Sequence, residues 1–78
     1  SCETTGQKHR IVMAQEVSFF NKPRILKKLN AIPEDSTVVL DFSRSKAVAL
    51  DVTDLVKDFM REAQSKNIKV ETIALPSQ

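Results

Sequence analysis

Apolar side chains in residues 37–63 change their spacing once, and this change predicts a strand followed by a helix. Residues 38–42, VVLDF, begin as an unbroken aliphatic run, which is typical of a strand that is covered on both faces. From residue 52 onward the apolar positions are three and four residues apart, so they fall on one side of an α-helix. These positions are Val52, Leu55, Val56, Phe59, Met60 and Ala63.

Two more strands and one more helix are predicted on either side of this pair. Residues 9–18 are apolar on alternating faces, and residues 68–75 alternate at first and become apolar at their end, so both segments predict strands. A helix is predicted from Asn21, a capping residue, to about Ala31, with Phe20 packing back onto it as a hydrophobic staple. Its expected buried stripe consists of Ile25, Leu26, Leu29 and Ile32.

The predicted order β-α-β-α-β indicates an α/β fold with a small, mainly parallel sheet. Two crossovers of the same hand place both helices on one face of the sheet and leave the other face open. An open face calls for a covering helix outside this sequence, a second copy of the chain or another partner. We expect residues 9–78 to form a single domain and residues 1–8 to be a flexible terminus or a cloning remnant.

The loop after the central strand is the first candidate site, because open α/β sheets place ligands at the carboxyl ends of their strands. It carries Ser43, Arg44, Ser45 and Lys46, a basic and hydroxyl-rich group suited to an anion, a nucleotide phosphate or a protein partner. The alternative is an ordinary polar loop. Asp51 is expected to cap the following helix. The loop contains no glycine, so nucleotide binding stays open but unsupported.

Composition argues against several classes of function. The chain has 78 residues, a net charge of +2 and neither Trp nor Tyr, which does not favour nucleic acid binding. With only Cys2 and His9 there is no thiolate metal site and no nucleophilic triad. Asp41, Asp51 and Asp54 would suit Mg²⁺ if they gathered, but each also has a structural explanation at a strand end or a helix start. We therefore expect a soluble, non-enzymatic chain without metal or cofactor.

Basic residues follow the outward side of the first predicted helix. They are Lys22, Arg24, Lys27 and Lys28. A solvated helix surface is the simpler interpretation of such a pattern. Contact with anionic lipid head groups or with an acidic partner is the alternative.

Four phrases in the chain resemble one known domain family. VSFFNK, PEDSTVVLDFSRS, LDVTDLVKDF and NIKVETIAL are similar to the STAS domain at the cytoplasmic C-terminus of bacterial SulP-type inorganic anion transporters, and the resemblance covers residues 11–75. It implies a STAS-like fold whose final helix is missing from this sequence. It also implies a regulatory or assembly module on the cytoplasmic face of the inner membrane. The implied partner is the transmembrane domain of a transporter for sulfate, bicarbonate or a related anion, with another cytosolic protein or a second copy as further partners.

The same fold occurs in free-standing bacterial anti-sigma factor antagonists, which are the alternative. Their loop D-S-[ST]-G carries a phosphorylated Ser or Thr, and this resemblance implies Thr53 as the phospho-acceptor. Val52 and Asp54 depart from that motif. Because an acidic neighbour repels an added phosphate, the departure favours the transporter branch.

Overall fold

The computed structural model describes residues 8–14 and 16–76, so the expectations for residues 1–7, including Cys2, lie outside the described residues. Most of this part of the chain belongs to regular elements. In chain order they are β1 (Lys8–Val12), β2 (Glu16–Val17), the 3₁₀ turn η1 (Phe19–Asn21), α1 (Lys22–Asn30), β3 (Thr37–Asp41), β4 (Ala47–Val48), α2 (Leu50–Ser65) and β5 (Lys69–Ile73).

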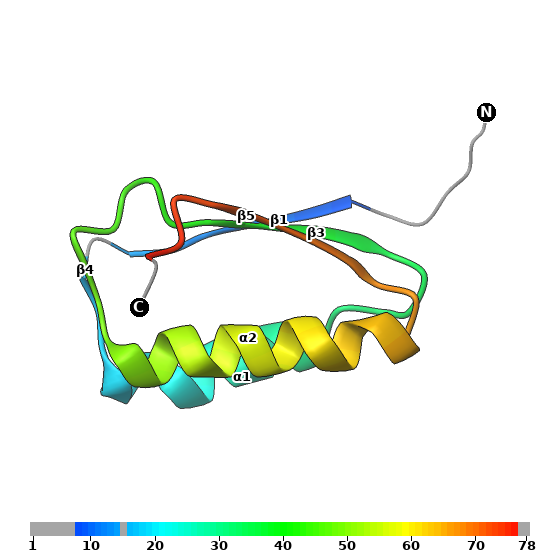
Figure 1. Cartoon of the computed structure of the whole chain (residues 1–78), viewed down its shortest axis with the longest axis horizontal. Helices are drawn as coiled ribbons and strands as arrows, with labels where there is room; N and C mark the ends of the chain where they lie inside the picture. The colour runs from blue at the N-terminus through cyan, green and yellow to red at the C-terminus, as the bar shows by residue number, and fades with distance from the viewer. Residues whose placement is uncertain (1–7, 15, 77–78) are drawn as a thin grey trace.

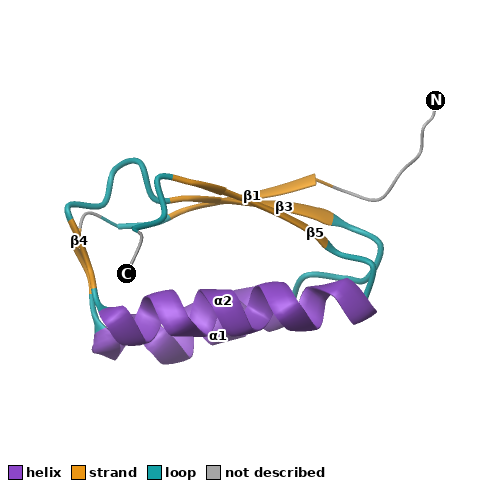
Figure 2. Ribbon diagram, in the orientation of Figure 1, coloured by secondary structure: helices purple, strands orange, loops and turns teal. Residues whose placement is uncertain are grey.

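The main sheet has three parallel strands in the order β1-β3-β5, with β3 in the centre. Its register places Leu40 between Ile11 and Thr72. Both helices run along one face of this sheet, and the described residues place no helix on the other face (Figure 1, Figure 2). The predicted α/β class, the parallel pairing and the shared helix face are therefore confirmed.

The hydrophobic core lies between the sheet and the two helices. Alternate residues of the central strand point into it, and α2 supplies the largest share from the helix side. The buried core residues of these two elements and the residue after β3 are Val38, Leu40, Phe42, Val52, Leu55, Val56, Phe59 and Ala63. Of the predicted helix stripe only Met60 is partly exposed, so the predicted register of α2 is confirmed.

A second, two-stranded parallel ladder interrupts the predicted pattern. Residues 9–18 are not one strand, because β1 ends at Val12 and β2 pairs separately with β4. In this ladder Glu16 lies opposite Ala47, and Val17 lies opposite Val48. The predicted loop of residues 43–50 therefore contains a short strand. Two-residue strands are too short for a periodicity to reveal them.

The start of α1 differs from the prediction in three places. Asn21 is the N-cap residue of α1, as predicted, but its side chain makes no cap hydrogen bond; its Oδ1 instead accepts a hydrogen bond of 2.7 Å from the backbone N–H of Ser18, the residue before η1. Phe20 is 88% exposed, so the predicted staple is wrong. Leu26 is 43% exposed and does not belong to the buried stripe, whereas Ile25 and Leu29 are buried as predicted.

The two ends of α2 are closed by the backbone. Asp51 is not the N-cap, because the helix begins at Leu50 after Ala49; it lies in the first turn, where its charge still favours the helix dipole. At the other end Asn67 has a φ of 54°, a left-handed conformation that Asn adopts after the end of a helix. The N–H of Ile68 donates to the carbonyl of Ala63, which completes the closing turn.

The uncovered face of the sheet is partly shielded by its own side chains. Val39 is only 7% exposed, and its neighbours across the two ladders are Arg10 and Glu71, whose long side chains flank it. Val12 and Ile73 on the same face remain exposed. The apolar end of the last strand is therefore no more buried than its start.

Candidate functional site

The loop between β3 and α2 is fastened to neighbouring segments along its length. A turn closes where the N–H of Ser45 donates to the carbonyl of Phe42 at 3.0 Å. The hydroxyl of Ser45 donates to the carbonyl of Ala14 at 2.5 Å, after β1. The N–H of Ala49 donates to the carbonyl of Val17 at 2.8 Å, which extends the β2-β4 ladder. These bonds hold the loop in one position at the carboxyl end of the sheet.

The carboxylate of Asp41 fixes the first residue of this loop. Its side chain is 4% exposed; Oδ1 accepts a 2.8 Å bond from the N–H of Ser43, and Oδ2 accepts a 2.5 Å bond from Arg10. Hydrogen bonds from Ser43, and then the Arg10 guanidinium, hold the pKa of Asp41 at about 2. A carboxylate that stays ionised and fully engaged is a structural anchor rather than a general acid or base.

Arg10 is a residue that sequence reasoning missed. It lies on β1, 31 positions before its partner Asp41, so only strand pairing brings the two side chains together. The available signal was the alternation of side chains along β1, which places Arg10 on the face opposite Ile11. That signal identifies the face but not the partner.

This anchor predicts a specific loss of stability in acid. Because the folded-state pKa of Asp41 lies below the ordinary value of 3.8, its contribution is complete above about pH 4 and disappears as pH falls to about 2. We expect the difference in unfolding free energy between wild type and Asp41→Asn to shrink over that range. Urea unfolding at a series of pH values measures it. A difference that stays constant between pH 4 and pH 2 would contradict the assignment.

The candidate loop residues reach solvent in part. Ser43, Arg44 and Lys46 are exposed, whereas Ser45 is half-buried. The N–H groups of Ser43 and Ser45 already donate to Asp41 and to Phe42, so they do not form a free cradle for a phosphate. The loop therefore offers charged side chains at fixed positions, and nucleotide binding gains no support.

The predicted acidic and phospho-acceptor residues lie apart from this loop surface. Asp51 and Asp54 line a groove of about 360 Å³ on the outer side of the helix layer, away from Asp41 on the open face of the sheet. Within residues 8–14 and 16–76 no three acidic, His or Cys side chains gather as metal ligands. Thr53 is 0% exposed, and its hydroxyl donates to the carbonyl of Ala49 at 3.5 Å. A kinase would reach it only after α2 opened at its start.

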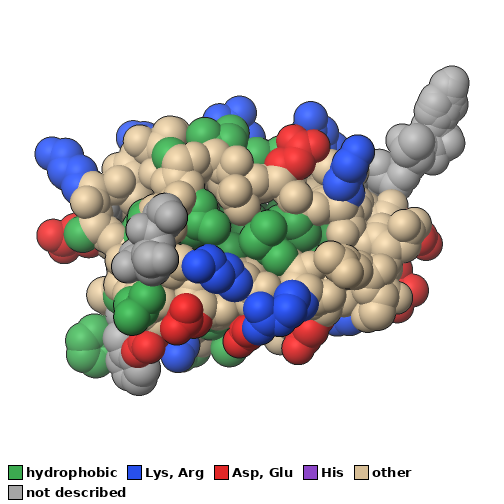
Figure 3. All heavy atoms as spheres, viewed as in Figure 1, with side chains coloured by type: hydrophobic (Ala, Val, Ile, Leu, Met, Phe, Trp, Pro, Cys, Tyr) green, Lys and Arg blue, Asp and Glu red, His purple; other side chains and the backbone are tan. Residues whose placement is uncertain are grey.

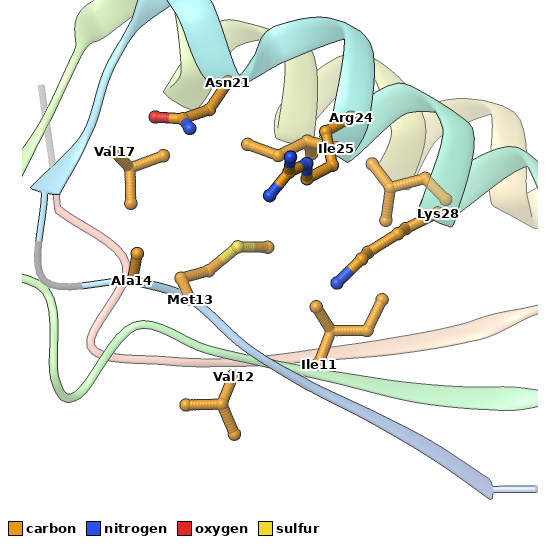
Figure 4. A pocket seen from close by; sticks show the side chains of 10 residues that line it. Ile11, Val12, Met13, Ala14, Val17, Asn21, Arg24, Ile25 and Lys28 are labelled. Carbon is orange, nitrogen blue, oxygen red and sulfur yellow. The ribbon is translucent and has the colours of Figure 1, made fainter.

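The predicted basic face of α1 is divided between different surroundings. Lys22 lies at the groove that holds the acidic residues of α2. Arg24 and Lys28 lie on the other side of α1, where they line a pocket of about 150 Å³ against β1 (Figure 4). Lys27 is exposed. Lys22 is therefore separated from the other three cations, whereas Arg24, Lys27 and Lys28 lie close together on the surface of α1 because they are three and four residues apart.

The surface on the β5 side of the molecule carries apolar side chains between its two layers. Figure 3 shows them in the middle of this face, between the sheet above and the helices below, with acidic and basic side chains along the helix layer. Met60, Val70 and Leu75 pack against the core while remaining partly exposed. This strip is a place where a further element or a partner would bury apolar area.

Comparisons with known proteins add no family to these observations. Neither the protein-family models, nor the curated proteins, nor the solved structures gave a match. In the described part of the chain, none of the helices combines the length and the apolar character that crossing a bilayer requires.

Proposed function

We propose that this chain is a STAS regulatory or assembly domain on the cytoplasmic side of a bacterial SulP-type transporter for sulfate, bicarbonate or a related anion. The observation that carries the proposal is the β3-α2 loop, which is fastened by Ser45 and Ala49 while Arg44 and Lys46 face solvent. A rigid loop with exposed cations is suited to recognising an acidic surface. The transmembrane domain of the transporter is the proposed partner.

A binding role fits the chemistry of the loop better than catalysis. The one carboxylate at its base, Asp41, is neutralised by Arg10 and held by Ser43. His9 is on β1, and its register partner is Val38 near the opposite end of β3, away from the loop. The hydroxyl of Ser45 is engaged with the carbonyl of Ala14, so the proposed role of the loop is recognition of a partner rather than catalysis.

The proposed family also accounts for the apolar strip beside β5. In the proposed family a further helix follows the last strand, and such a helix would cover Met60, Val70 and Leu75, which are partly exposed here. The antagonist alternative is less well supported, because its acceptor Thr53 is fully buried.

The reading frame upstream of Ser1 tests the transporter assignment directly. A SulP-type parent requires about ten or more apolar spans of roughly 20 residues before this domain. Sequencing the complete gene and mapping its membrane topology would show them. An upstream frame without such spans would overturn the proposal.

A transport assay tests the role of the loop within that parent. We expect Arg44→Ala combined with Lys46→Ala to change anion uptake by at least about twofold, because removing rim charges weakens recognition of an acidic partner. Uptake of radiolabelled sulfate or bicarbonate by cells, normalised to transporter in the membrane, is the measurement. Lys27→Ala, which removes an exposed cation from α1, is the control. Equal uptake by the loop variant and the wild type would contradict a recognition role.

A further inference from the structure

A pocket of about 150 Å³ lies between the end of β1 and α1, away from the outer groove between the helices. Figure 4 shows Ile11 and Met13 below it and Ile25 above it, with Val17 at one side. Met13, Val17 and Ile25 are buried, so the interior of the pocket is apolar and belongs to the core. Neither the role proposed for the β3-α2 loop nor the proposed contact with the transporter involves this pocket.

Two cations stand at the mouth of the pocket. Arg24 and Lys28 are four residues apart on α1, and Figure 4 shows the nitrogen atoms of both directed towards the space above Met13. Both side chains belong to exposed residues. Among the described residues neither has an ion-pair partner, and none of the described residues that line the pocket is acidic. The charges are therefore available to an anion.

We propose that the pocket binds a short-chain monocarboxylate, with its hydrocarbon chain inside and its carboxylate between Arg24 and Lys28. The volume sets the size of the chain, since an apolar cavity of about 150 Å³ is filled by a body of about six carbons, such as benzene. The two cations set the charge of the head group, because guanidinium and ammonium groups form short charge-assisted bonds to carboxylates. Hexanoate is therefore the best-fitting probe. This proposal does not depend on the transporter assignment.

The surface beside the pocket also favours an anionic ligand. A neighbouring hollow along β1 shares Ile11 and Lys28 and adds Lys8 and His9. The Nε2 atom of His9 is buried without a hydrogen-bond partner among the described residues. This basic surface attracts an anion that approaches Lys28. A neutral ligand of the same shape should therefore bind less well.

A chain-length series tests the fit of the hydrocarbon part. Butyrate, pentanoate, hexanoate and octanoate are titrated into isotope-labelled protein while the methyl resonances of Met13, Ile11 and Ile25 are followed. We expect half-saturation by hexanoate at about 1 mM, which is ordinary for a ligand of this size. Affinity should rise roughly fourfold for each methylene up to hexanoate, as burial of a methylene predicts, and then level off. A flat series, or no saturable change in these methyl resonances, would overturn the proposal.

Charge and shape variants test the position of the ligand. Arg24→Gln combined with Lys28→Gln should weaken the binding of hexanoate at least about tenfold. Hexanol should bind the wild-type protein at least about tenfold more weakly than hexanoate does. Lys27→Gln is the matched control, since it removes a cation from the same helix outside the pocket. Ala14→Phe should block the mouth of the pocket from an exposed position. Equal losses in the control and the double variant, or full binding by Ala14→Phe with an unchanged fold, would overturn the assignment.

Discussion

Replacement of Phe59 by alanine should lower the unfolding free energy by about 3 to 5 kcal/mol, the range for deleting a buried phenyl ring. Phe59 is 8% exposed and packs in the core cluster between α2 and the sheet. Because the helices cover only one face of the sheet, the described residues include no further layer whose side chains could move into the cavity left by the ring. Urea unfolding followed by far-ultraviolet circular dichroism measures the change.

Leu26→Ala is the control for this prediction, because Leu26 looks equally apolar in the sequence but is 43% exposed on α1. We expect it to cost about 1 kcal/mol or less. A Phe59→Ala midpoint close to that of the wild type would mean that α2 is rotated about its axis from the described register.

Periodic segments were predictable because one physical constraint decides them. Every apolar position of α2 between Val52 and Ala63 has to face the sheet, and spacings of three and four leave one helical register that satisfies this. The central strand was predictable for a similar reason, since its apolar run is only stable when it is buried. Because each helix connects one strand to the next by short loops, the parallel pairing of the strands was predictable as well.

The width of the buried stripe on α1 was not predictable from the same rule. Ile25 and Leu29 lie on the line that faces the sheet, whereas Leu26 is turned by about 100° from Ile25 towards the outer groove between the helices. How far a helix side is covered depends on its neighbours, and here the sheet has only three strands. Phe20 was predicted to pack back onto α1 from the turn before it; it does lie in that turn, η1, but its side chain is directed to solvent.

The position of the loop between the central strand and α2 agrees with the prediction, but its internal structure also depends on distant residues. The sequence places Ser43, Arg44 and Lys46 together because they are adjacent in the chain. Some of the bonds in the loop are local, but others come from segments about thirty residues away: the Ser45 hydroxyl donates to the carbonyl of Ala14, and Asp41 is paired with Arg10. A single sequence does not indicate which distant residues pair in this way until the register of the strands is known.

The segment after β1 connects the two surfaces that the proposals use. Met13 and Ala14 line the pocket that holds the proposed carboxylate, and the carbonyl of Ala14 also accepts the hydroxyl of Ser45. The pocket and the loop therefore share one short piece of backbone. Variants of the loop should be checked for an intact pocket, and variants of the pocket for an intact loop, before either function is assigned.

Substitution of Thr53 by aspartate should destabilise the domain by more than about 3 kcal/mol, because it buries a carboxylate at a fully buried position. The helix dipole near the start of α2 offsets only about 1 kcal/mol of that cost.

Thr53→Val is the matched control for the aspartate variant. It removes only a long hydrogen bond to the carbonyl of Ala49, which also accepts bonds from the N–H groups of Val52 and Thr53, so the cost should stay within about 1 kcal/mol. Urea unfolding of the three proteins at neutral pH gives both differences. If Thr53→Asp were as stable as the wild type, a phosphate at this position would be tolerated, and the anti-sigma antagonist alternative would regain its main support. A large loss in the aspartate variant alone would mean that this helix start is built for packing rather than for a phosphorylation switch.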